Sequence, residues 1–63
     1  MTNESVAFAE FKAADKAWSA ELKRVFGKNA GDARYDERGI STVELRLFHA
    51  AFMRARDAWR KEA

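Results

Sequence analysis

The sequence predicts an all-α protein: an antiparallel two-helix hairpin, with helices at about residues 3–26 and 41–62 joined by a long loop. The chain has no proline, and its three glycines all fall between positions 27 and 39. Alanine, the strongest helix former, is abundant in both flanking segments. The large apolar residues in each segment recur mainly at spacings of three, four and seven, which is the pattern of one helical face.

The first predicted helix, about residues 3–26, has a polar start and a glycine stop. Thr2 or Asn3 can serve as its N-cap, and Glu4 lies in the first turn, where a carboxylate meets the positive end of the helix dipole. Gly27 is placed to end the helix in the left-handed conformation. The apolar face of this helix consists of Phe8, Phe11, Trp18, Leu22 and Val25.

The second predicted helix, about residues 41–62, begins with the capping-box pattern Ser-Thr-Val-Glu. In this interpretation Ser41 accepts a hydrogen bond from the Glu44 backbone N–H, and the Glu44 carboxylate reaches back to the Ser41 N–H. Ile40 and Leu45 are spaced for a hydrophobic staple around this cap. The apolar stripe has the 3-4-3-4 spacing of a heptad seam and consists of Leu45, Phe48, Phe52, Ala55 and Trp59.

Folding the chain as a hairpin predicts which apolar side chains meet between the helices. Leu22 should lie against Leu45 and Phe48. Trp18 should reach Phe48 and Phe52. Phe8 and Phe11 should cover Trp59, and Phe26 should lie near Ile40 and Leu45.

Residues 27–40 form a connection longer than the two to eight residues that usually join packed helices. We expect one or two helical turns between residues 32 and 38, with Asp32 as their cap. The run Arg34-Tyr35-Asp36-Glu37-Arg38 combines a large amphipathic ring with charges of both signs, and Tyr and Arg dominate interface hot spots. Tyr35 is therefore either a residue offered to a partner or a side chain folded back onto the hairpin.

Several apolar residues fall outside the predicted seam. Leu47, Ala51 and Ala58 form a second apolar strip on the second helix, and Val6, Val43 and Met53 also lie off the seam. A chain of this length has marginal stability as a single hairpin, and oligomerisation is a common remedy. We therefore expect a homodimer, two hairpins pairing into a four-helix bundle. The alternative is that the strip packs under the loop, with Tyr35 as its lid.

The residue types argue against catalysis. The chain has no cysteine, and its single histidine, His49, has no carboxylate at helical spacing. Two helices also provide no cavity in which a nucleophile, a base and an orienting acid could converge. The acids of the loop lack the alternating pattern of a calcium site, and the glycines lack the spacing of a phosphate-binding loop. We expect neither an enzyme nor a metal or cofactor site.

The excess of positive over negative charge in the chain lies on the second helix. The net charge of the chain is +2, and residues 41–62 carry five bases and three acids. Arg56 and Arg60 share one side of this helix, whereas Arg54 and Lys61 share another. Arginine suits bidentate contacts with phosphate or carboxylate, so this helix could lie on a nucleic-acid backbone. The alternative is a solvated helix face.

The functional hypothesis is a non-enzymatic, protein-binding accessory or inhibitory factor that acts through a helical-hairpin surface as one domain, residues 1–63. The alternatives are a small nucleic-acid-binding regulator that uses the basic face of the second helix, and a structural piece of a larger assembly. With no secretory-signal pattern and no apolar run of about 18 residues, we expect a cytoplasmic protein without a membrane span. We also expect a small bacterial protein, encoded by a phage or a plasmid. The candidate partner-binding residues are Arg34, Tyr35, Asp36, Arg38, Arg46, Arg54, Arg56 and Arg60.

Overall fold

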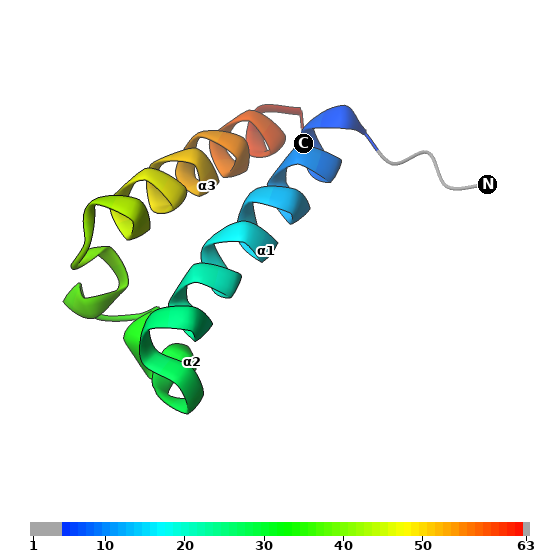
Figure 1. The fold of residues 1–63 in the computed structure, drawn as a ribbon. Helices are drawn as coiled ribbons and strands as arrows, with labels where there is room; N and C mark the ends of the chain where they lie inside the picture. The colour runs from blue at the N-terminus through cyan, green and yellow to red at the C-terminus, as the bar shows by residue number, and fades with distance from the viewer. Residues whose placement is uncertain (1–4, 63) are drawn as a thin grey trace.

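A computed structural model describes residues 5–62 as two long antiparallel helices closed at one end by a folded connection (Figure 1). Helix α1 spans Val6–Phe26 and helix α3 spans Val43–Glu62. The connection contains a 3₁₀ turn, η1 (Gly27–Asn29), the short helix α2 (Ala30–Ala33) and a second 3₁₀ turn, η2 (Glu37–Ile40). Residues 5–62 contain no strand. The predicted all-α hairpin is confirmed.

Helix α1 begins later than the sequence pattern predicts. Ser5 is the N-cap: its backbone is extended, and its hydroxyl accepts a hydrogen bond from the Phe8 N–H at 3.0 Å. The predicted start near residue 3 is therefore wrong by about three residues, and the predicted caps at positions 2 and 3 and the first-turn acid at position 4 lie outside the described residues. The helix ends, as predicted, at Gly27, whose φ of +59° favours glycine.

The start of α3 corrects the predicted capping box. The cap is Thr42, whose hydroxyl accepts from the Leu45 N–H at 3.0 Å. Ser41 belongs to the preceding turn instead, because its N–H and its hydroxyl both donate to the Arg38 carbonyl, at 3.2 and 2.7 Å. Glu44 is consequently the second residue of the helix, one position short of the third, which a capping box requires.

The predicted hydrophobic staple fails for the same reason. With Thr42 as the cap, the two staple positions fall on Ser41 and Arg46, which are both polar. Ile40 is correspondingly exposed, whereas Leu45 is fully buried against the core. The burial of Leu45 therefore comes from the helix pair and the connection, without the staple.

The connection is more ordered than a loop, although its turns differ from the predicted ones. Helical turns occupy residues 30–33 and 37–40, on either side of a bend at residues 34–36. The cap of the second turn is Asp36, whose carboxylate accepts from the Arg38 N–H at 2.8 Å. The prediction of Asp32 as a cap is wrong, because Asp32 lies inside α2.

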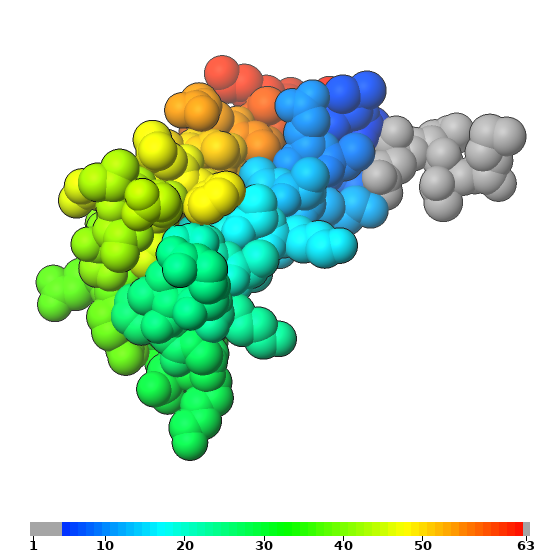
Figure 2. All heavy atoms as spheres, viewed as in Figure 1, coloured from blue at the N-terminus to red at the C-terminus, as the bar shows by residue number. Residues whose placement is uncertain are grey.

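The fully buried part of the core lies where the connection meets both helices. Its apolar residues are Trp18, Leu22, Ala33 and Leu45. Figure 2 shows the atoms of the connection, in green, lying against the ends of both long helices. The Trp18 indole N–H donates to the Gly39 carbonyl at 3.1 Å, so that a buried donor is satisfied by the connection. A Cβ at Gly39 would lie 2.9 Å from the Ala33 carbonyl oxygen, and this close approach requires glycine.

Toward the chain ends, the helices meet through stacked aromatic rings. The ring centroids of Phe8 and Phe11 lie 4.9 and 5.0 Å from that of Trp59. Phe52 lies 5.4 Å from Phe11 and 5.3 Å from Trp18. These distances confirm the predicted contacts of Trp59 with Phe8 and Phe11 and of Trp18 with Phe52. All of these rings except Trp18 remain partly exposed.

One position in the predicted seam of α3 is wrong. Phe48 is 37% exposed, and the ring that meets Trp18 beside Phe52 is His49, edge-on at 4.8 Å. The inward face of α3 is therefore rotated toward His49 and Arg56, which are half-buried on the side of the connection. This rotation leaves Phe48 on the opposite side of the seam. Neither long helix, within the described residues, is apolar enough over a sufficient length to cross a membrane.

Candidate partner-binding site

A hollow of about 360 Å³ lies between the connection and α3, and we call it the arginine hollow. It brings together three of the eight predicted binding residues: Arg34, Tyr35 and Arg56. Its remaining lining residues are Trp18, His49, Phe52 and Met53. The hollow thus combines aromatic and thioether surface with two guanidinium groups, a mixture that suits an apolar group carrying or neighbouring a negative charge.

Arg34 is a wall of the hollow and also a structural link. Its guanidinium forms an ion pair with Asp15 and donates to the Ser19 hydroxyl at 2.8 Å, so the end of α2 is attached to α1. The same guanidinium lies 4.4 Å from the ring centroid of Trp18 and 5.2 Å from that of Phe52. Because these contacts cover most of its side chain, Arg34 shapes the hollow more than it reaches outward.

Tyr35 is the most exposed large hydrophobic residue described in the chain, with 84% of its surface accessible. Its backbone is held in place, because its N–H donates to the Asp32 carbonyl at 3.2 Å. The interpretation of Tyr35 as a lid folded onto the hairpin is therefore wrong. Since the residue also lines the hollow, its ring stands at the rim, available to another molecule.

Arg56 has a donor that its surroundings do not satisfy. Its Nε is buried and has no hydrogen-bond partner among residues 5–62, and its nearest carboxylate oxygen, on Asp57, is 3.9 Å from Nη2. About a third of the side chain is exposed. The exposed part of the side chain can therefore contact a further molecule.

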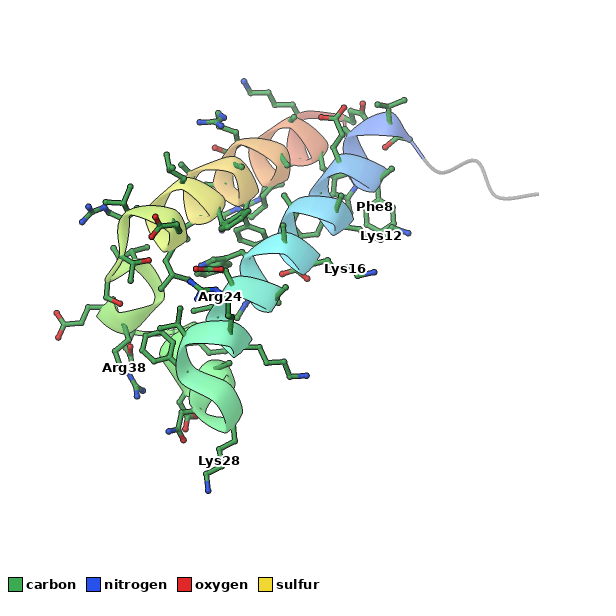
Figure 3. All side chains as sticks on the ribbon, in the orientation of Figure 1. Phe8, Lys12, Lys16, Arg24, Lys28 and Arg38 are labelled. Atoms are coloured by element: carbon green, nitrogen blue, oxygen red, sulfur yellow. The ribbon has the colours of Figure 1, made fainter. Side chains whose placement is uncertain are left out.

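Asp36 and Arg38, two other predicted binding residues, are occupied with each other. Arg38 donates from Nε to both carboxylate oxygens at 3.1 Å and from Nη2 at 2.7 Å. These side-chain hydrogen bonds, together with the one from the Arg38 backbone N–H, hold the pKa of Asp36 below its ordinary value. The pair forms a local cap at the turn end, where Arg38 projects from the connection (Figure 3). The sequence pattern did not anticipate this pairing.

The arginines of α3 divide between two sides of the helix. At 100° per residue, Arg46, Arg56 and Arg60 fall in one row with His49 and Met53, at the 3-4-3-4 spacing of a helix face. This row runs past the arginine hollow. Arg54 lies apart from it, in a second depression between α1 and α3. The structure therefore separates Arg54 from the other predicted residues.

Sequence reasoning missed four residues of the hollow: Trp18, His49, Phe52 and Met53. For two of them a signal was present, because His49 and Met53 precede Arg56 by seven and three positions and thus share its face. Trp18 and Phe52 were assigned to the seam, correctly, but their rings also reach the connection side. Trp18 and Phe52 line the hollow only because of the way the connection folds, and the spacing of apolar residues in the helices does not predict that fold.

The fold is a small helical hairpin. Beside its folded connection lies a hollow that is lined by aromatic side chains and arginines. Among residues 5–62, no group of three His, Cys, Asp or Glu side chains is placed to hold a metal ion. Comparisons of the chain with protein-family models, curated proteins and solved structures gave no match.

Proposed function

We propose that this protein is a cytoplasmic, non-enzymatic accessory or inhibitory factor that binds another protein through the arginine hollow. The observation that supports this most strongly is Tyr35, an 84%-exposed ring at the rim of a hollow lined by Trp18, Phe52 and Arg56. Tyrosine, tryptophan and arginine are the residues that most often dominate binding energy at protein interfaces.

The hollow and the arginine row together specify the chemistry of a matching partner segment. An apolar side chain fits against Trp18, Phe52 and Met53, and Tyr35 closes over it from the rim. Carboxylates on the same segment face Arg46, Arg56 and Arg60. Such charge complementarity accelerates encounter and fixes the orientation of the partner.

The alternative is a nucleic-acid-binding regulator, in which Arg46, Arg56 and Arg60 would contact backbone phosphates. Two observations favour a protein partner. Arg54 and Lys61 project from a different side of α3 than Arg46, Arg56 and Arg60, which reduces the basic patch that a phosphate backbone could contact. The lining of the hollow is largely aromatic and apolar, and phosphate contacts make no use of such a surface. Salt distinguishes the two cases, because phosphate contacts weaken steeply with ionic strength.

The identifying experiment replaces Tyr35 with the photo-crosslinking residue benzoylphenylalanine and irradiates the protein in extract from its native cells. A matched variant carries the same residue at Leu47, which lies away from the hollow. We expect a discrete protein adduct from position 35, absent from position 47 and lost when Arg56→Glu is added. Adducts with nucleic acid at position 35 would support the alternative. No adduct at position 35, with foreign-protein adducts at position 47, would refute the proposed site.

Once the partner is isolated, Tyr35→Ala gives the quantitative test. We expect its affinity to fall about thirtyfold, because truncating a hot-spot residue costs about 2 kcal/mol of binding free energy. Thermal unfolding of the free protein should change by less than about 0.5 kcal/mol, since the ring is exposed. Isothermal titration and a thermal melt measure the two quantities. A loss of affinity below threefold would exclude Tyr35 as the anchor.

A further inference from the structure

The face of the hairpin opposite the arginine hollow carries a second depression, of about 420 Å³, which we call the alanine groove. Its lining residues are Glu10, Ala13, Ala14, Ala51, Arg54, Ala55 and Ala58. The connection does not cover this face: Arg34 reaches α1 through Asp15 and Ser19, which lie on the other side of Trp18 from Ala14 around the helix. The groove is therefore open to a further molecule.

Large apolar residues border the alanine groove along α3. Leu47 is 66% exposed and Val43 is 57% exposed, and Phe48 projects to the same side of the seam. Leu47 and Phe48 precede the groove residue Ala51 by four and three positions. They are therefore its neighbours on the helix surface. Small side chains between larger apolar ones allow a second helix to approach at the usual 8–10 Å between axes.

Charges of opposite sign lie on α1 and α3 at two levels of this face, one inside the groove and one beyond it. Near its middle, Glu10 of α1 and Arg54 of α3 line the same depression. Toward the turn end the signs are exchanged, with Arg24 on α1 and Glu44 on α3. Hydrogen bonds to Glu21 are the main cause of the raised pKa of Arg24, and the charge of Glu44, on α3, contributes least. Figure 3 shows Arg24 extending from α1 toward α3.

This charge arrangement is complementary to itself. A two-fold axis parallel to the helices lays α1 of one copy over α3 of the other at the same level. Glu10 then faces Arg54 of the partner subunit, and Arg24 faces Glu44 of the partner subunit. An axis perpendicular to the helices would instead lay α1 on α1, which takes Glu10 away from Arg54 and Arg24 away from Glu44.

We propose that the alanine groove binds a second copy of this chain, so that α1 of each copy packs antiparallel to α3 of the other in a two-fold four-helix bundle. Stable interfaces bury about 800 Å² per partner. The broad side of the hairpin measures 36 by 21 Å, an area similar to that value. A stable dimer would therefore bury most of one face. The arginine hollow lies on the other face and stays open, which makes this inference independent of the proposed function.

Substitutions that reverse the charges at the interface test the proposed dimer. Light scattering after gel filtration, over a hundredfold range of concentration, should give about 14 kDa for the wild type, twice the 7.2 kDa of one chain. Arg54→Glu and Glu10→Arg should each weaken the dimer at least tenfold, because each brings two like charges together at both symmetry-related positions. The double variant restores opposite charges and should recover at least half of the lost association.

Arg46→Glu is the matched control, because it makes the same charge change at an exposed position of α3 beside the hollow. It should leave the mass near 14 kDa, and far-UV circular dichroism should show all four variants to be as helical as the wild type. A wild type that stays monomeric at every concentration would overturn the proposal. So would a dimer that Arg46→Glu dissociates and Arg54→Glu leaves intact, since that would place the interface on the other face.

Discussion

The two ends of the hairpin are built from similar numbers of large side chains but bury them differently. At the turn end, Trp18, Leu22 and Leu45 are all at least 95% buried. At the open end the ring centroids of Phe8 and Phe11 lie 4.9 and 5.0 Å from that of Trp59, yet all three rings remain partly exposed. The difference is the connection, which covers the seam from a third side at the turn end only.

A third element, however short, converts the seam between two helices into a core. Two helices share only one line of contact, so a ring between them keeps a flank in water. The connection covers that flank by placing Ala33 and Gly39 against Trp18 and by attaching Arg34 to Asp15. Much of the segment first considered as a partner-binding loop is therefore part of the folded structure.

The largest expected effect is the loss of a buried turn-end side chain. Leu22→Ala should cost about 2–5 kcal/mol of unfolding free energy, because the deleted atoms leave a cavity in packed surroundings. Phe8→Ala removes a larger side chain from the open end, but it should cost less, since that ring is already partly in water. Urea unfolding of both variants measures the difference. A greater cost for Phe8→Ala would invert the comparison between the two ends.

A smaller effect is expected where the connection meets Trp18. Gly39→Ala should destabilise the protein by about 1–3 kcal/mol, because the new Cβ would lie 2.9 Å from a backbone carbonyl oxygen. Gly31→Ala is the control: its Cβ would meet nothing within 4 Å, and alanine should stabilise its helical turn by about 0.5–1 kcal/mol. Thermal melts of the two alanine variants should shift in opposite directions. Equal shifts would mean that the Gly39 contact has no energetic weight.

The smallest expected effect distinguishes the two candidate caps of α3. Thr42→Ala should cost about 1 kcal/mol, the usual value for an N-cap hydroxyl. Ser41→Ala should cost only a few tenths of that, because its exposed hydroxyl bonds a single carbonyl outside the helix. Urea unfolding at fixed protein concentration ranks the two variants. The reverse order would restore the capping box that begins at Ser41.

The sequence predicted most of the contacts that depend on helical period, although it placed Phe48 in the seam where the structure has His49. The spacing of Phe8, Phe11, Phe52 and Trp59 sets which rings meet, and Gly27 sets where α1 ends. It did not predict the cap of α3, because Ser41 and Thr42 are adjacent and both are good N-caps. Only the hydrogen bonds of Ser41 to the preceding turn decide between them, and those bonds require the folded connection.

The candidate site was predictable to a similar extent. Tyr35, Arg34 and Arg56 were each named from residue type, but their meeting depends on a bend in the connection that carries no sequence signature of its own. Asp36 and Arg38 remain exposed, but their local pairing across two positions was not evident from residue type. Arg54 was separable from Arg56 by helical angle alone, and the structure places it in the opposite groove.

The hydrogen bond from Trp18 to Gly39 joins residues only 21 positions apart, whereas Phe8 and Trp59 are separated by almost the whole chain. Contacts that close short loops form sooner than contacts that close long ones. We therefore expect the chain to fold from its connection outward, with the helix ends joining last. In the folded protein the same gradient should order amide hydrogen exchange, slowest near Leu22 and Leu45 and fastest where the two helices end.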